Sequence, residues 1–233
     1  ALFTQNACRM PLYWDNYPVN DAEMTDELHI GPYRQRDPSL YRFSRGVIAN
    51  GMEYAESSKI AFATIAAYTW DPLRYDPETS WHAALEQVAG KRQLPDVLRF
   101  ADNVRYSCLN PAESPGLAEA IARFDFESVY GNRDEAIARL ERLFTAMSTS
   151  AEALLSGGAD NAALMQEMER WLRKYGQGCK LLLQSLACLR DGDPVSLERL
   201  RVRYDAYRED RTYVFGDVLD AFLHKVLEQR YTP

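Results

Sequence analysis

Side chains that can bind a polar ligand stand at the end of a predicted strand. The run Leu12–Val19 is apolar and aromatic like a buried strand, and Pro18 ends it because proline donates no N–H to a sheet. Trp14, Asn16 and Asp21 therefore lie on or just beyond the carboxyl end of this strand. Ligands bind at this end of the strands in barrels and open α/β sheets. Asn, Pro and Asp are also common in turns, so a plain turn is the alternative.

A second strand is predicted over Gly46–Ala49, and it ends in a similar way. Asn50 and Gly51 follow it, and both residue types accept the positive φ of a loop. Asn50 thus has the same place relative to its strand as Asn16 has relative to the first. About 25 residues join the two strands, more than the dozen that a parallel crossover needs, although they show little helical pattern. We therefore expect the two strands to be parallel, with their carboxyl ends at one edge.

The chain after the second strand is predicted to be helical, because apolar residues recur at helical spacing. Asn132 is the expected N-cap of the clearest helix, Arg133–Leu154. Asp160 is the expected N-cap of the next helix, in which an apolar stripe runs from Leu164 to Tyr175. Gly176 and Gly178 are expected to kink or break this later helix. Helices are predicted over Glu53–Trp70, Pro77–Val88, Pro95–Val104, Leu117–Phe126, Arg133–Leu154, Cys179–Leu189, Leu197–Tyr207 and Val214–Leu227, and residues 1–11 are expected to be irregular.

The predicted fold is mainly α, and its two parts differ in character. Residues 1–51 have the pattern of the end of an α/β domain, and residues 52–233 have that of an antiparallel helical bundle with short loops. Two strands do not form a stable sheet alone, so residues 1–51 need further strands from elsewhere. We expect the chain to begin within a larger protein.

Composition excludes several classes of protein. The formal net charge is −7, which argues against binding to nucleic acid, and 46% of residues are hydrophobic, enough for a sizeable core. No apolar run approaches the roughly 20 residues of a membrane span, so no membrane partner is expected. There is no Gly-rich phosphate loop and no Gly-x-Ser-x-Gly motif.

Cysteine and histidine spacing predicts neither a metal site nor a disulfide framework. The four cysteines form no Cys-x-x-Cys pair, and the three histidines lie far apart in the sequence. We therefore expect no cofactor and no metal, and the cysteine count does not decide the compartment. The residues are Cys8, Cys108, Cys179 and Cys188, with His29, His82 and His224.

A series of short motifs occupies the first 75 positions of the chain. They are Trp14-Asp15-Asn16, Asn20-Asp21, Gly31-Pro32-Tyr33 with Arg36, Gly46–Asn50, Glu56–Ala61 and Tyr68–Pro72. In this order they resemble glycoside hydrolase family 84, the β-N-acetylglucosaminidases that include protein O-GlcNAcases and bacterial enzymes often called hyaluronidases. The resemblance is dense from Leu12 to Trp81, and beyond Trp81 only the helical architecture matches.

The resemblance implies the fold and the roles of four residues. It implies a (β/α)8 barrel whose last two strands are Leu12–Val19 and Gly46–Ala49, followed by a helical domain. It places Trp14 in the wall around an N-acetyl group, an apolar contact that excludes water. It assigns Asn16, Asp21 and Asn50 to hydrogen bonds with sugar hydroxyls and the acetamido region, which suits an acceptor-only carboxylate and amides that both donate and accept. The implied ligand is an N-acetylglucosamine-containing glycan or glycoprotein.

The chain departs from the family at the catalytic pair. The family uses two adjacent aspartates, one holding the acetamido group and one acting as acid and base, whereas this chain contains no Asp-Asp. Asp15 does not replace them, because strand alternation turns it away from Trp14 and Asn16. We therefore assign no catalytic residue here and expect the N-terminal barrel portion of the same enzyme as a partner. The alternative is a non-catalytic helical interaction module with a vestigial pocket rim.

Overall fold

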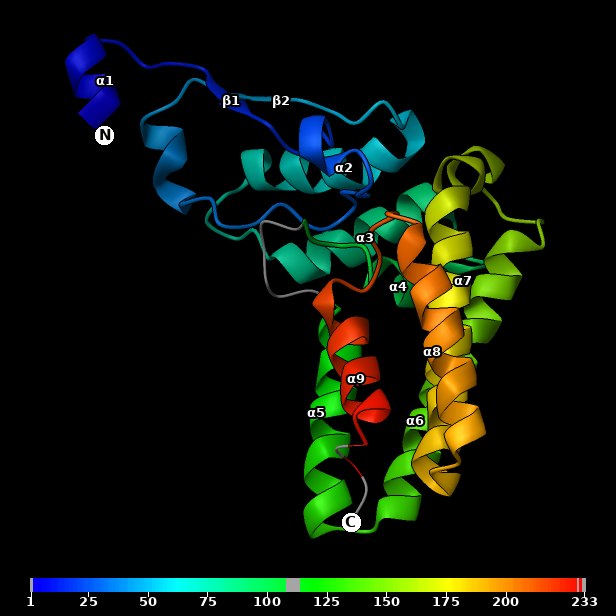
Figure 1. Ribbon diagram of the computed structural model, residues 1–233. Helices are drawn as coiled ribbons and strands as arrows, with labels where there is room; N and C mark the ends of the chain where they lie inside the picture. The colour runs from blue at the N-terminus through cyan, green and yellow to red at the C-terminus, as the bar shows by residue number, and fades with distance from the viewer. Residues whose placement is uncertain (1, 108–113, 230, 232–233) are drawn as a thin grey trace.

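The computed structural model describes residues 2–107, 114–229 and 231, so Cys108 lies outside the described residues. The fold is mostly helical with two short strands, as predicted. Figure 1 shows the strands, α2 and α3 at one end of the molecule, with long helices extending away from them. The elements in chain order are α1 (Leu2–Ala7), β1 (Tyr13–Asp15), η1 (Ala22–Met24), η2 (Pro38–Arg42), β2 (Val47–Ala49), α2 (Ala55–Trp70), α3 (Pro77–Ala89), α4 (Leu94–Ala101), α5 (Pro115–Tyr130), α6 (Arg133–Leu155), α7 (Ala162–Asp191), α8 (Pro194–Glu209) and α9 (Asp217–Leu227), where η marks a 3-10 helix.

The two strands pair in parallel, which confirms the predicted crossover. Trp14 of β1 lies opposite Ile48 of β2, and Asp15 lies opposite Ala49. The first strand is shorter than predicted, because β1 ends at Asp15 and the chain beyond it is irregular up to η1. The connection between the strands contains only the two 3-10 helices, in keeping with its weak helical pattern.

The two faces of this small sheet differ in burial. Asp15 is only 4% exposed, and Val47 and Ala49 pack against Tyr33 and the α2 residues Ile65 and Tyr68. On the other face the aromatic side chain of Trp14 is 62% exposed, and Ile48 beside it is 40% exposed. Alternate residues of a strand point to opposite faces. One face of the sheet is thus covered by α2, and the described residues leave the other face open.

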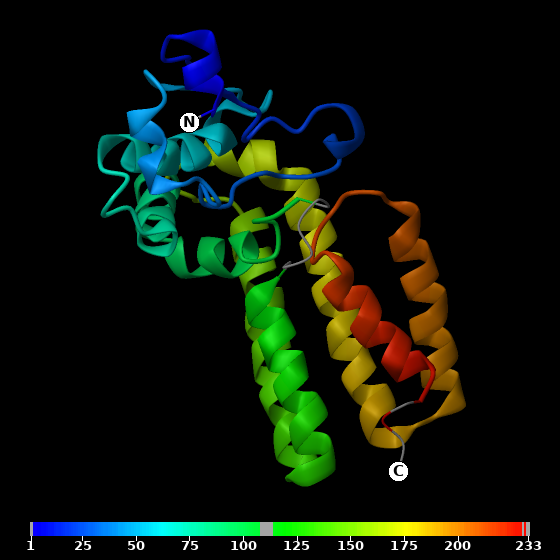
Figure 2. The same cartoon turned by 90° about the vertical axis from the view of Figure 1, so that its left-hand side faces the viewer.

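Helices α5 to α9 form the elongated part of the molecule (Figure 1, Figure 2). The long helix α7 contacts α2, α6, α8 and α9, so it links the two ends of the fold. It is one continuous helix through Gly176 and Gly178, so the predicted break there is wrong. A Cβ atom at Gly178 would lie 2.3 Å from a ring carbon of Phe215, so glycine here permits close packing of the segment before α9.

Two further local predictions are wrong. The N-cap of α7 is Asn161, whose side-chain oxygen accepts from the backbone N–H of Leu164 at 3.0 Å, whereas Asp160 pairs with Arg92. The N-terminal segment predicted to be irregular contains α1, a helix without buried residues. The predicted cap of α6 is confirmed, because the Asn132 side chain accepts from the first turn of that helix.

The segment between the strands belongs to the main hydrophobic core. Leu28 and Ile30 are at most 1% exposed and lie in the same cluster as the helical core. The indole N–H of Trp81 in α3 donates to the carbonyl of Ile30 at 2.7 Å. This packing continues across the expected domain boundary at residue 51, and that boundary stays a prediction.

Helix α2 receives its N-terminal cap from α7. Its own N-cap residue, Tyr54, makes no capping hydrogen bond through its side chain. The carboxylate of Glu167 instead accepts from the backbone N–H of Glu56 at 3.0 Å and of Ser57 at 2.8 Å. A carboxylate at a helix N-terminus satisfies free N–H groups and opposes the positive end of the helix dipole.

We expect Glu167→Ala to lower the free energy of unfolding by about 1–2 kcal/mol, the usual cost of losing a helix cap. The matched control is Glu169→Ala, since Glu169 makes only an exposed ion pair with Arg173 on the same helix and its loss should cost less than about 0.5 kcal/mol. Urea denaturation of the three proteins measures the difference. Equal losses from the two variants would contradict the capping role.

Hydrogen exchange should distinguish the strands from the helical core. Amides of α6 and α9 should exchange slowly because these helices bury continuous apolar faces, whereas each strand in the described residues has a single partner. We therefore expect β1 amides to exchange at least about tenfold faster than those of α6. Comparable protection in β1 and α6 would show that the sheet is completed in solution, for example by a second copy of the chain.

Candidate functional site

Three of the four predicted site residues meet at the carboxyl end of the strands. The indole N–H of Trp14 donates to the side-chain oxygen of Asn16 at 2.8 Å, and the amide nitrogen of Asn50 lies 3.5 Å from the same oxygen. The backbone N–H of Asn50 donates to the carbonyl of Asp15 at 3.0 Å, which continues the pairing of the strands. These three side chains thus form one exposed polar and aromatic cluster.

The fourth residue, Asp21, lies farther along the same turn. It precedes η1, its side chain is exposed, and its carboxylate makes no capping bond to that helix. The backbone N–H of Val19 donates to the carbonyl of Asn50 at 2.8 Å, which holds the turn against the end of β2. In the described residues no side-chain hydrogen bond joins Asp21 to the other three.

A buried ion pair behind the cluster holds β1 in place. The Asp15 carboxylate accepts from Arg36 through Nε at 2.7 Å and Nη2 at 2.8 Å, and from the hydroxyl of Tyr33 at 2.5 Å. This hydrogen bonding with Asp15 raises the pKa of Arg36, and burial followed by the bond to Asp15 raises the pKa of Tyr33. Arg36 therefore stays charged and Tyr33 stays neutral, so both act as permanent donors to the carboxylate.

Tyr33 links this ion pair to the helices. Its backbone N–H donates to the Thr64 hydroxyl in α2 at 3.0 Å, and its carbonyl accepts from the Tyr75 hydroxyl at 2.7 Å. Its ring packs edge-on against Tyr68, with 5.2 Å between the centroids. Three residues of the sequence motifs, Tyr33, Arg36 and Tyr68, thus support the site from behind. The signal for this role was the alternation of β1, which buries Asp15 and so requires a charged partner for it.

The turn that carries Asp21 is braced by a buried histidine. His29 Nδ1 lies 2.8 Å from the carbonyl oxygen of Val19, and its Nε2 lies 2.6 Å from a carboxylate oxygen of Glu27. The Asn20 amide donates to the Glu27 carbonyl at 2.8 Å, so the two arms of the turn are tied together twice. This bracing positions the backbone at Asp21, although sequence spacing assigned His29 no role.

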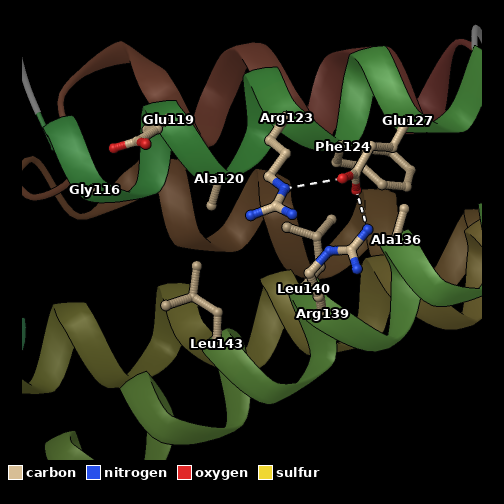
Figure 3. Close-up of a pocket in the computed structure, with 10 residues that line it drawn as sticks. All are labelled: Gly116, Glu119, Ala120, Arg123, Phe124, Glu127, Ala136, Arg139, Leu140 and Leu143. Carbon is tan, nitrogen blue, oxygen red and sulfur yellow. Dashed lines mark hydrogen bonds and ion pairs between the residues drawn. The ribbon is translucent and has the colours of Figure 1, made fainter. Parts of the chain in front are cut away.

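A separate groove of about 300 Å³ lies between α5 and α6 (Figure 3), on helices that extend away from the strands. Ala120, Phe124 and Leu143 line it with apolar surface, and Glu127 forms ion pairs with Arg123 and Arg139. Hydrogen bonds from Arg139 and Arg123 lower the pKa of Glu127. Its carboxylate is therefore committed to an ion-pair network with the two arginines.

Among the described residues, no group of three or more His, Cys, Asp or Glu side chains could hold a metal ion. Cys8 is free and exposed, and Cys179 and Cys188 are free and buried. No described helix is both long and apolar enough to span a membrane.

Comparison with known proteins relates this geometry to a family. A family model described as beta-N-acetylglucosaminidase matches residues 1–102. The structure of an O-GlcNAc hydrolase mutant from Thermobaculum terrenum is 30% identical in sequence and superposes with a TM-score of 0.84. The alignment covers 97% of this chain and 50% of the hydrolase chain. The resemblance to glycoside hydrolase family 84 is confirmed. The chain is therefore similar to part of an O-GlcNAc hydrolase.

Two more distant structures share the fold. CpGH84B is 24% identical with a TM-score of 0.83, and CpGH84D is 19% identical with a TM-score of 0.82. Each alignment covers 97% of this chain but only 41% of the other protein. The chain therefore spans at most half the length of each of these three structures.

We expect Asp15→Asn to lower the free energy of unfolding by about 2–3 kcal/mol, because it removes the charged acceptor of Arg36 in a mostly buried pair. The control Asp21→Asn makes the same chemical change at an exposed carboxylate and should cost less than about 0.5 kcal/mol. Urea denaturation followed by circular dichroism measures both. A loss from Asp15→Asn no larger than that of the control would contradict the supporting role of the pair.

Proposed function

We propose that this chain supplies part of the N-acetylglucosamine pocket of a retaining, substrate-assisted β-N-acetylglucosaminidase. The observation that carries the proposal is the meeting of Trp14, Asn16 and Asn50 at the carboxyl ends of two parallel strands. It occurs within the part of the chain that matches the β-N-acetylglucosaminidase model. Ligands of barrel enzymes bind at that end of the strands.

In this proposal β1 and β2 are the last two strands of a (β/α)8 barrel. The uncovered apolar face with Trp14 and Ile48 supports it, because a barrel strand covers one face with helices and turns the other to the interior. Residues 1–51 then form the end of the barrel domain, and residues 52–233 form an antiparallel helical bundle. The N-terminal barrel portion of the same enzyme is the proposed partner.

The proposed roles follow from the chemistry of each side chain. Trp14 packs its ring on the apolar part of the N-acetyl group, while Asn16 and Asn50 hydrogen-bond the polar atoms around it. Asp21, which is exposed and free of a capping bond, accepts from two neighbouring sugar hydroxyls. The ligand is an N-acetylglucosamine-containing glycan or glycoprotein.

The catalytic step requires groups that this chain does not supply. In the proposed mechanism the acetamido oxygen of the substrate attacks the anomeric carbon. One carboxylate orients the acetamido group, and a second protonates the leaving oxygen. Asp15 is committed to Arg36 on the opposite face of β1, and Asp21 is assigned to the hydroxyls. A vestigial rim on an interaction module is less favoured, since such a module has no need of this cluster.

We expect Asp21→Ala in the full-length protein to reduce transition-state stabilisation by about 2–4 kcal/mol, as for a charged hydrogen-bond partner of a buried ligand. Asn16→Ala should cost less, because its bonds to the sugar are neutral. The comparison is made through kcat/KM on a chromogenic N-acetylglucosaminide. Glu23→Ala, an exposed carboxylate two residues away, is the control and should keep the wild-type value. Wild-type kinetics for Asp21→Ala would refute its place in the pocket.

We expect the chain by itself not to hydrolyse N-acetylglucosaminides. Loss of the proton donor alone typically lowers the rate by about 10²–10⁴, and an open pocket admits water that weakens every polar contact. The test assays the purified chain on the same substrate, with and without the separately produced N-terminal portion. Turnover only after mixing supports the proposal. Turnover by the chain alone that is lost on mutating one of its own carboxylates would overturn it.

A further inference from the structure

The orientation of the Asn16 amide is determined by its neighbour Trp14. An indole N–H can donate a hydrogen bond but cannot accept one. The Asn16 atom that lies 2.8 Å from the indole nitrogen must therefore be the carbonyl oxygen, as the structure has it. Rotation of the amide by half a turn would place two donors against each other and lose this bond. The –NH₂ group of Asn16 consequently points away from the indole.

The same oxygen determines how Asn50 is oriented. The Asn50 amide nitrogen lies 3.5 Å from it, and the reverse orientation would bring two carbonyl oxygens together. The backbone of Asn50 is held on both sides, by its N–H to the Asp15 carbonyl at 3.0 Å and by its carbonyl to the Val19 N–H at 2.8 Å. Within the described residues, no group donates a hydrogen bond to the Asn50 side-chain oxygen. No group there accepts one from the Asn16 amide nitrogen either.

We propose that Trp14 is a positioning residue that makes the two asparagines chemically unequal, with Asn16 acting as the donor to the ligand and Asn50 as the acceptor. The inference rests on the proposed function and extends it. It assigns Trp14 a second task besides forming a wall. The ligand atom that faces Asn16 is then an acceptor, such as a carbonyl oxygen, and the group that faces Asn50 carries an O–H or N–H.

Two variants of equal size and charge test this polarity in the full-length protein. Asn16→Asp retains an acceptor for the indole but removes the donors to the ligand, so the affinity for N-acetylglucosamine should fall at least about tenfold. Asn50→Asp retains the acceptor for the ligand but sets a carboxylate oxygen in place of the amide nitrogen that faces the Asn16 oxygen, so the affinity should fall, but less than in Asn16→Asp. Calorimetry measures both. An equal or larger loss from Asn50→Asp would overturn the assigned polarity.

A third variant separates the apolar contact of the Trp14 ring from the hydrogen bond that its N–H donates to Asn16. Trp14→Phe keeps an aromatic ring but has no N–H, so the Asn16 amide is free to rotate. We expect the affinity to fall about three- to tenfold, the usual cost of one neutral hydrogen bond. In this background Asn16→Asp should cost less than it does beside Trp14, because the amide no longer has a fixed orientation. Purely additive losses in this double-mutant cycle would contradict a positioning role for Trp14.

The indole proton gives a readout that requires no sugar. In the chain itself, the Trp14 N–H resonance should move downfield in Asn16→Asp, since a charged acceptor forms the stronger bond, and upfield in Asn16→Ala. Trp14→Phe assigns the signal, and the indoles of Trp81 and Trp171, which donate to backbone carbonyls elsewhere, serve as internal references. An unmoved Trp14 signal overturns the positioning inference and leaves the proposed function standing. A signal that moves as expected, while no variant alters sugar affinity, overturns the proposed function.

Discussion

The arrangement of the strand ends depends on the burial of one carboxylate. Asp15, the last residue of β1, points away from Trp14 to the other face of the sheet, where Arg36 and Tyr33 supply three hydrogen bonds to it. A buried carboxylate without such partners would be costly, so this pair restrains both the strand and the long connection that follows it. Because side chains alternate along β1, fixing Asp15 on one face also fixes Trp14 on the other, and Trp14 in turn hydrogen-bonds Asn16.

The helices transmit this restraint to the rest of the fold. Tyr33 contacts α2 through Thr64 and Tyr68, and α2 is in turn capped by Glu167 of α7. The core that contains Leu28 and Ile30 continues into the long helices without interruption. A sheet of two strands has too little pairing to be stable alone. Its order in this chain therefore comes from packing on helices that follow it in the sequence.

One face of the two-stranded sheet is left open by the described residues. Trp14 and Ile48 are large apolar side chains left exposed beside each other, on the side away from α2. In our proposal this apolar face is turned toward the interior of a barrel. The polar side chains of Asn16 and Asn50 lie beside Trp14 at the carboxyl end of the strands.

The sequence by itself determined the elements and the position of most site residues. Prolines and capping side chains such as Asn132 set helix ends through local hydrogen bonds, and the strand pattern placed Trp14, Asn16 and Asn50 at one edge. Only the tertiary structure decided how distant residues pair. The cap of α2 comes from a residue 110 positions away, and Gly178 lies inside α7, where the absence of a side chain leaves room for the Phe215 ring. Local propensity is worth only about 1 kcal/mol per residue, so a single long-range contact is enough to override it.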